Sequence, residues 1–199
     1  MNGQMIITIG REFGSGGHEI AERIASHYGI AFYDKQLIQE VAEDGMISPS
    51  VVAQFDEKPL SVFARPMPGD GSNLSMEQQI ALRTFTYLNK QANVNKASFV
   101  VVGRCAECFL VGNPALTRIF VLGDQDAKRK RIMEKYQLDG KQALLRMRRE
   151  DKLRKSYHNF YCESKWGDSR TYDLCINSSL LGVEKTAEAL IQYLDLRYA

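Results

Sequence analysis

A glycine-rich segment close to the amino terminus has the residue types of a phosphate-binding loop. The apolar run at residues 5–9 leads into GREFGSGGH, which holds four glycines within eight residues. Glycines let successive backbone N–H groups converge on an anion, and the partial positive charge at the start of the following helix favours it. We therefore expect phosphate binding, although a tight strand-to-helix turn that serves packing alone would use the same glycines.

The loop departs from both common nucleotide-binding patterns. In G-x-x-x-x-G-K-[ST], with Gly16 as the second glycine, Arg11 replaces the first glycine, Gly17 the lysine and His18 the hydroxyl residue. The dinucleotide pattern G-x-G-x-x-G fails because its last position is Glu19. The spacing predicts a phosphate ligand without identifying the compound.

A second segment, RMRREDKLRKSY at residues 146–157, is rich in arginine. On a helix, Asp151 and Arg154 lie three residues apart and share a face with Arg148 and Lys155. Arginines gathered on one side of a helix suit phosphate binding and neutralisation of a phosphoryl group in transfer, and Asp151 would hold a guanidinium in place. A solvated surface helix with pairs of opposite charge would show the same pattern.

The same region dominates the charge distribution. Residues 128–155 contain twelve Lys or Arg and four Asp or Glu, a net charge of +8 in 28 residues. The rest of the chain therefore carries −6 against the overall +2. A local basic segment on an otherwise acidic protein points to an anionic ligand.

The cysteines allow several interpretations. Four in 199 residues are too few for a disulfide scaffold, so reduced thiols are expected. Cys105 and Cys108 have the C-x-x-C spacing of a redox-active pair or half a zinc site, but Cys162 and Cys175 do not form a second such pair. We interpret Cys105 and Cys108 as core positions of a helix, and His158, which lacks a partner pattern, as a structural or surface residue.

Five short apolar runs must position these residues, at 5–9, 30–33, 98–102, 118–122 and 172–176. Near-continuous apolar runs are typical of strands buried on both faces of a parallel sheet, and their alternation with helical stretches indicates a doubly wound α/β fold. The connections after the second and fourth runs are too long for one crossover. Helical patterns at 35–43 and 76–90 flank a turn-rich loop at 66–73, so residues 35–96 form a helical insertion. The basic segment fills the other long connection.

Length and composition fit one domain spanning residues 1–199. Hydrophobic residues make up 44% of the chain and charged residues 25%, which is ordinary for a globular protein. Neither a bilayer-spanning apolar run nor a signal peptide is visible, so we expect a cytoplasmic protein without a membrane partner.

Together, GREFGSGGHEIA, FYDKQLI, VVVGR, RREDKLRKSYHNFY and YDLCINSS resemble the cytidylate kinase-like family, a divergent branch of the nucleoside monophosphate kinases. The likeness extends over about residues 6–194. It implies a three-layer α/β/α P-loop kinase fold with a five-stranded parallel sheet, a monophosphate-binding insertion after the second strand and a basic lid, residues 128–168, between the fourth and fifth. It also implies transfer of the γ-phosphoryl group of ATP, with Mg²⁺, to a nucleoside monophosphate such as CMP or a similar small acceptor.

The resemblance assigns roles to individual residues. The catalytic arginines would be Arg11, Arg148, Arg149 and Arg154. ATP would be bound by Gly10, Gly14, Ser15, Gly16, Gly17, His18 and Glu19. The acceptor would be bound by Asp34, Arg104 and Asp151. No protein ligand to a metal is assigned.

Two positions depart from true cytidylate kinases, which have lysine where this chain has Gly17 and aspartate where it has Cys105. Arg11 or His18 would take over the role of the lysine.

Other functions stay open. A regulatory protein that binds nucleotide but is catalytically weak or inactive would also explain the missing lysine. Asp34 lies 20 residues after Gly14, where a dinucleotide-dependent oxidoreductase binds ribose, and the +8 segment would also suit RNA. The arginine-rich connection argues against an oxidoreductase, and a nucleic-acid partner is less expected than a nucleotide. The sequence does not define the oligomeric state.

Overall fold

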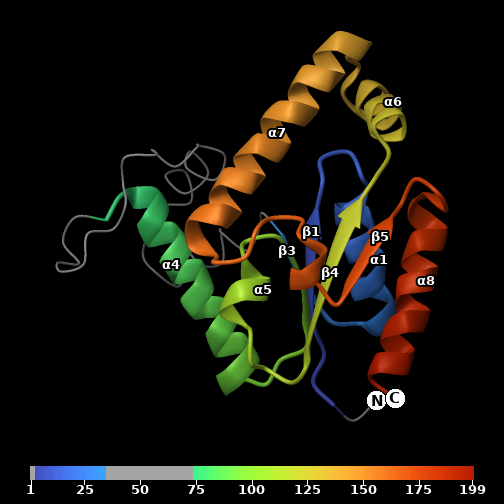
Figure 1. Cartoon of the computed structure of the whole chain (residues 1–199). Helices are drawn as coiled ribbons and strands as arrows, with labels where there is room; N and C mark the ends of the chain where they lie inside the picture. Colours follow the sequence, from blue (N-terminus) through green and yellow to red (C-terminus); the bar gives the residue numbers. More distant parts are fainter. Residues whose placement is uncertain (1–2, 35–73) are drawn as a thin grey trace.

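A parallel sheet of five strands forms the centre of the computed structural model, which describes residues 3–34 and 74–199 (Figure 1). The strand order is β2-β3-β1-β4-β5, and all paired neighbours run parallel. The strands are β1 (Ile6–Arg11), β2 (Ala31–Tyr33), β3 (Phe99–Val102), β4 (Leu116–Leu122) and β5 (Leu174–Asn177). The predicted five-stranded parallel sheet is confirmed.

Helices cover both faces of the sheet because the strands are apolar on both sides. On one face, α1 (Gly17–Tyr28) and α8 (Gly182–Arg197) pack on Ile7, Ile9 and Val121. On the other, α4 (Met76–Asn89), a π-helical turn (Lys90–Val94) and α5 (Ala106–Phe109) pack near Ile6 and Phe99. This arrangement confirms the three-layer α/β/α prediction.

The register brings three loops to one edge of the sheet. Ile9 of β1 is aligned with Val102 of β3, and Gly10 with Phe120 of β4. The segments after β1, β3 and β4 therefore leave the sheet side by side, where ligands bind in open α/β sheets.

The predicted helix at 76–90 is present and begins with a capping box. Ser75 Oγ accepts from the Gln78 amide, and the Gln78 side chain accepts from the Ser75 amide. The helix predicted at 35–43 and the loop at 66–73 lie outside the described residues, so the limits of the insertion, 35–96, stay a prediction.

The basic connection folds into two helices, α6 (Gln125–Tyr136) and α7 (Gly140–Tyr161), followed by a short 3₁₀ turn (Ser169–Thr171). A small cluster of Phe13, Ile132, Ala143 and Met147 fastens both helices to the glycine-rich loop. The long helix α7 extends across the end of the sheet (Figure 1). No helix in the described ranges is long and apolar enough to span a bilayer.

Candidate active site

A cavity of about 430 Å³ lies where the glycine-rich loop, the end of β3 and the lid helices meet. Eleven of the predicted site residues line it: Gly10, Arg11, Gly14, Gly16, Gly17, His18, Glu19, Asp34, Arg104, Arg149 and Arg154. Ser15, Arg148 and Asp151 are not among the lining residues. The structure therefore brings residues far apart in the sequence to one cavity.

The glycine-rich loop allows no side chain at its turn into α1. Gly16 precedes the helix in the left-handed conformation, with φ 78°, and a Cβ there would lie 2.5 Å from Val183 Cγ2. A Cβ on Gly17 would lie only 2.7 Å from Cβ of Arg11. The space that a lysine at position 17 would need is therefore taken by Arg11.

Arg11 reaches from the glycine-rich loop to the end of β3. Its guanidinium lies against Gly103, where an added Cβ would overlap Arg11 Nη1. Gly103, Arg104 and Cys105 follow one another with φ of 73°, 63° and 55°, all left-handed. Two consecutive non-glycine residues in this region are uncommon, and such strain is concentrated at functional sites.

His18 faces the end of β2. Its Nε2 lies 2.8 Å from Asp34 Oδ2, and its ring meets Phe32 edge-on with centroids 5.3 Å apart. The two predicted residues thus form one hydrogen-bonded pair, which lines the cavity at the end of β2.

Two cations that the sequence analysis did not single out lie beside the glycine-rich loop. Arg131 and Lys135 of α6 both pair with Glu19 in the first turn of α1. The Arg131 Cζ would lie 3.6 Å from a Cβ on Gly16. Although burial raises the pKa of Glu19, Arg131 and Lys135 bring it below its ordinary value. Their i, i+4 spacing marks one helix face, but only the fold shows which face meets the loop.

Asp151 and Arg154 of α7 bind the backbone of the glycine-rich loop. Asp151 Oδ1 accepts from the Phe13 amide at 2.6 Å, and Arg154 Nη1 donates to the Arg11 carbonyl at 3.2 Å. Burial raises the pKa of Asp151, against the opposing effects of the Phe13 amide, Lys128 and Arg154. Burial lowers the pKa of Arg154. The two residues fix the lid helix to the loop.

An ion pair between Lys128 and Glu12 likewise fixes α6 to the glycine-rich loop. Lys128 Nζ donates to Glu12 Oε2 at 2.7 Å, and the Gly123 amide donates to the same oxygen at 3.1 Å. Lys128 is only 9% exposed, so the pair is largely shielded from solvent. The loop conformation therefore depends on both lid helices.

The remaining lid arginines differ in position. Both Arg148 and Arg149 are exposed, but Arg149 lines the cavity and pairs with Glu150, whereas Arg148 does not line it. Arg146, which was not predicted, lines the cavity with its guanidinium 3.7 Å from the centre of the Tyr136 ring.

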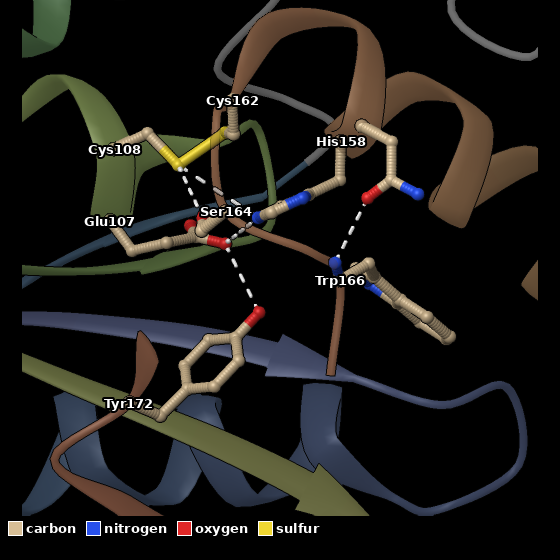
Figure 2. The surroundings of a disulfide bond; sticks show 8 residues. Glu107, Cys108, His158, Cys162, Ser164, Trp166 and Tyr172 are labelled. Atoms are coloured by element: carbon tan, nitrogen blue, oxygen red, sulfur yellow. Dashed lines mark hydrogen bonds and ion pairs between the residues drawn. A yellow bond between two sulfur atoms is a disulfide. The ribbon is translucent and has the colours of Figure 1, made fainter. Parts of the chain in front are cut away.

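The cysteines correct one expectation. Cys108 forms a disulfide with Cys162, at the end of α7, while Cys105 and Cys175 are free (Figure 2). The prediction that all four are reduced thiols is therefore wrong for this structure. Cys105 and Cys108 of the C-x-x-C segment are not bonded to each other. Cys105 is buried, whereas Cys108 faces His158 of α7. His158 is buried, as a structural role requires, but it has a partner in Glu107.

Comparison with known proteins agrees with this geometry. Residues 6–180 match the cytidylate kinase-like family. A solved structure of an uncharacterized protein from Eubacterium ventriosum is 46% identical, with a TM-score of 0.77, covering 96% of this chain and 99% of that one. No curated protein matches the chain.

Two more distant solved structures show the fold alone. Shikimate kinase from Acinetobacter baumannii has 12% identity and a TM-score of 0.51, over 97% of this chain and 93% of that one. A sugar kinase from Janibacter has 17% identity and a TM-score of 0.51, over 96% and 95%.

Proposed function

Because the chain belongs to the cytidylate kinase-like family, we propose that it transfers the γ-phosphoryl group of ATP to a nucleoside monophosphate, CMP or a close analogue, or to a similar small acceptor. One observation carries the proposal. Guanidinium groups from β1, from the segment after β3, from α6 and from α7 line the cavity that begins at the glycine-rich loop. Phosphoryl transfer depends mainly on positioning and on neutralising charge over three phosphate oxygens, which arginines do well.

The donor phosphates would lie at the glycine-rich loop. There α1 begins, with the partial positive charge of a helix amino terminus, and Arg131 lies beside Gly16 where no side chain fits. Arg131 would therefore supply the cation that the family pattern places at position 17. Arg131 is thus a further candidate for this role beside Arg11 and His18, which also line the cavity.

The acceptor would lie on the side of β2 and β3. Asp34, held by His18 at 2.8 Å, would orient the acceptor group, and Arg104 with Arg11 would bind its phosphate. Arg149 and Arg154 of α7 would neutralise the group in transfer. The sequence assigned Arg148 the same role, and its place outside the cavity lining makes it the weaker candidate.

Magnesium is implied by the family, and the residues fit it in part. The Ser15 hydroxyl donates to the Glu12 carbonyl, and Glu19 is engaged by Arg131 and Lys135, so neither suits the ion. Asp34 lines the cavity but is paired with His18, so it would reach Mg²⁺ at most through water, and the ATP phosphates and water would supply the other ligands. The ion, when bound with ATP, neutralises charge on the β- and γ-phosphates.

The proposal is tested by coupled ADP release with ATP, Mg²⁺ and each nucleoside monophosphate in turn. We expect one acceptor to stimulate ADP release and Arg154→Ala to lower its turnover more than tenfold. Lys152→Ala is the matched control, because Lys152 is an exposed cation of the same helix outside the cavity. Unchanged turnover in Arg154→Ala would remove Arg154 from the site.

The absence of space for a lysine at position 17 favours one alternative, a nucleotide-binding regulatory protein that does not turn over. Tight ATP binding by calorimetry with no transfer to any acceptor would support it. Absence of ATP binding would refute both proposals.

A further inference from the structure

Three groups that can ligate a soft metal converge behind the cavity. The sulfur atoms of Cys108 and Cys162 and Nε2 of His158 all lie within 4.8 Å of one another (Figure 2). Cys108 belongs to α5, whereas His158 and Cys162 lie four residues apart at the end of α7. Cys162 caps α7 in an extended conformation, and its amide donates to the His158 carbonyl, so both side chains lie at the last turn of the helix.

Glu107 lies next to these three groups and offers a carboxylate to the His158 side of the cluster. Its Oε1 lies 3.2 Å from His158 Nε2 and 3.5 Å from the hydroxyl of Tyr172. Its Oε2 is buried and has no hydrogen-bond partner in the described part of the chain. His158 Nδ1 is likewise without a partner there, so the ring makes its polar contacts from Nε2, on the side of the cluster. Glu107 and His158 are only 4% and 3% exposed.

Two separations in the cluster already resemble those of a tetrahedral zinc site. Bonds of about 2.3 Å to sulfur and about 2.0–2.2 Å to nitrogen and oxygen place neighbouring ligand atoms about 3.6 Å (S···N) and about 3.4 Å (N···O) apart. Here His158 Nε2 lies 3.8 Å from Cys108 Sγ and 3.2 Å from Glu107 Oε1. The two sulfurs, now bonded to each other, must move apart, and the Glu107 carboxylate must close on the cluster, because it does not lie within 4.8 Å of all three other ligand atoms.

We infer that the reduced chain binds one Zn²⁺ ion through Cys108, His158, Cys162 and Glu107. Two thiolates with an imidazole form the nitrogen–sulfur set that zinc prefers, and the burial of His158 and Cys162 is typical of a closed, structural site. Glu107 and His158 also border the cavity, which supplies a path of entry for the ion. The metal would join α5 to the end of the lid helix that carries Arg154.

Reduction must come first, and its chemistry is simple. A dithiol reductant of the thioredoxin class gives two electrons and two protons to the disulfide, and is itself oxidised to a disulfide. Zinc then displaces the two thiol protons. The inference rests on the proposed function at one point, since a protein that uses ATP works where thiols are kept reduced.

Metal binding is measured on the full chain after reduction with a phosphine and removal of bound metal. We expect about one equivalent of Zn²⁺ in competition with a chromophoric chelator. Co²⁺ should give thiolate-to-cobalt charge-transfer bands and the intense visible bands of a tetrahedral site. Cys108→Ser, Cys162→Ser and His158→Gln should each weaken binding more than about 100-fold, and Glu107→Gln by about 10–100-fold.

Cys105→Ser and Cys175→Ser are the matched controls and should bind zinc like the unmodified chain, because both thiols lie outside the cluster. Alkylation of the unmodified chain gives a readout that does not depend on how variants fold. Zinc should protect Cys108 and Cys162, but not Cys175, from iodoacetamide.

A disulfide that resists reduction, a reduced chain without zinc affinity, or full affinity in Cys108→Ser would overturn the inference. The measurement needs no ATP, so its failure is distinct from failure of the proposed kinase activity. A chain that binds zinc without transferring phosphoryl groups would refute the kinase proposal alone.

Discussion

Replacing Gly17 by alanine tests whether Arg11 occupies the place of a side chain at position 17. The new Cβ would lie 2.7 Å from Cβ and 3.2 Å from Cγ of Arg11, and 3.3 Å from Cβ of Val121. Carbon atoms prefer separations of about 3.5–4.0 Å, so the two backbones must part by roughly 0.8 Å. Because Cβ atoms cannot rotate away, the strain is not relieved by a change of rotamer.

The cost follows from two opposing effects. Overpacking of this kind costs about 1–3 kcal/mol, and replacing glycine in a helix returns at most about 1 kcal/mol. We expect a net loss of about 1–2 kcal/mol in the free energy of unfolding. With a slope of about 2 kcal/mol per molar urea, the midpoint of unfolding falls by about 0.5–1 M.

A double-mutant cycle separates this contact from other effects of the substitution. In an Arg11→Gly background the clashing Cβ is gone, so Gly17→Ala should cost about 1–2 kcal/mol less than in the unmodified chain. In an Arg11→Ala background the Cβ stays, and most of the cost should stay with it. Gly140→Ala is the control, since Gly140 also begins a helix and a Cβ there meets only Met133 Sδ, at 3.8 Å. Equal costs in the Arg11→Gly and Arg11→Ala backgrounds would refute the reasoning.

Further predictions follow from the site and its supports. Gly17→Lys should lower kcat/KM in the ADP-release assay, because its Cβ meets the same atom of Arg11; a gain in activity would contradict this. Arg131→Ala should weaken ATP binding more than tenfold by calorimetry, whereas Arg129→Ala, whose arginine pairs with Asp126 outside the cavity, should not. Asp139→Ala should lower the free energy of unfolding by about 1 kcal/mol, because it removes the capping box of α7, and urea unfolding would show the loss. Asp173→Asn should lower the free energy of unfolding by about 0.5–1 kcal/mol at pH 7. The expected loss is small because the ion pair with Arg118 is about a third exposed, so solvent screens it. Burial raises the pKa of Asp173 but Arg118 lowers it below its ordinary value, so this stabilisation is present above the unfolded pKa near 4 and is lost as pH falls through the folded pKa. Urea unfolding between pH 7 and pH 3 should show the difference between the two chains becoming smaller toward the acid end.

The sheet was predictable because its three central strands, β1, β3 and β4, are largely buried on both faces and consist mainly of consecutive apolar residues. The start of the fifth strand differs from the prediction because of a side-chain contact. Asp173, expected within this strand, precedes β5 and accepts hydrogen bonds from the Arg118 amide and guanidinium. The glycine-rich loop was predictable because its glycines are required by conformation and space.

The partners within the site were less predictable, because they depend on how distant segments meet. The segment 128–155, with twelve basic residues, indicates phosphate binding. Its sequence does not show that Arg131 faces the glycine-rich loop while Arg148 faces solvent. The link between Cys108 and Cys162 spans 54 residues and arises only because α7 returns to α5. His18 lacked a visible partner because Asp34 reaches it from the end of another strand.

The strand order has a consequence for synthesis on the ribosome. β1 is made first but lies at the centre of the sheet, between β3 and β4, and its partners Phe99 and Leu116 follow Ile6 by about a hundred residues. At about 5–20 residues per second, the apolar strand waits roughly 5–20 s before either edge can be paired. The nascent chain thus carries an unpaired hydrophobic strand for about half of its elongation, and holding that strand apart from other chains is the task that a chaperone would perform for this fold.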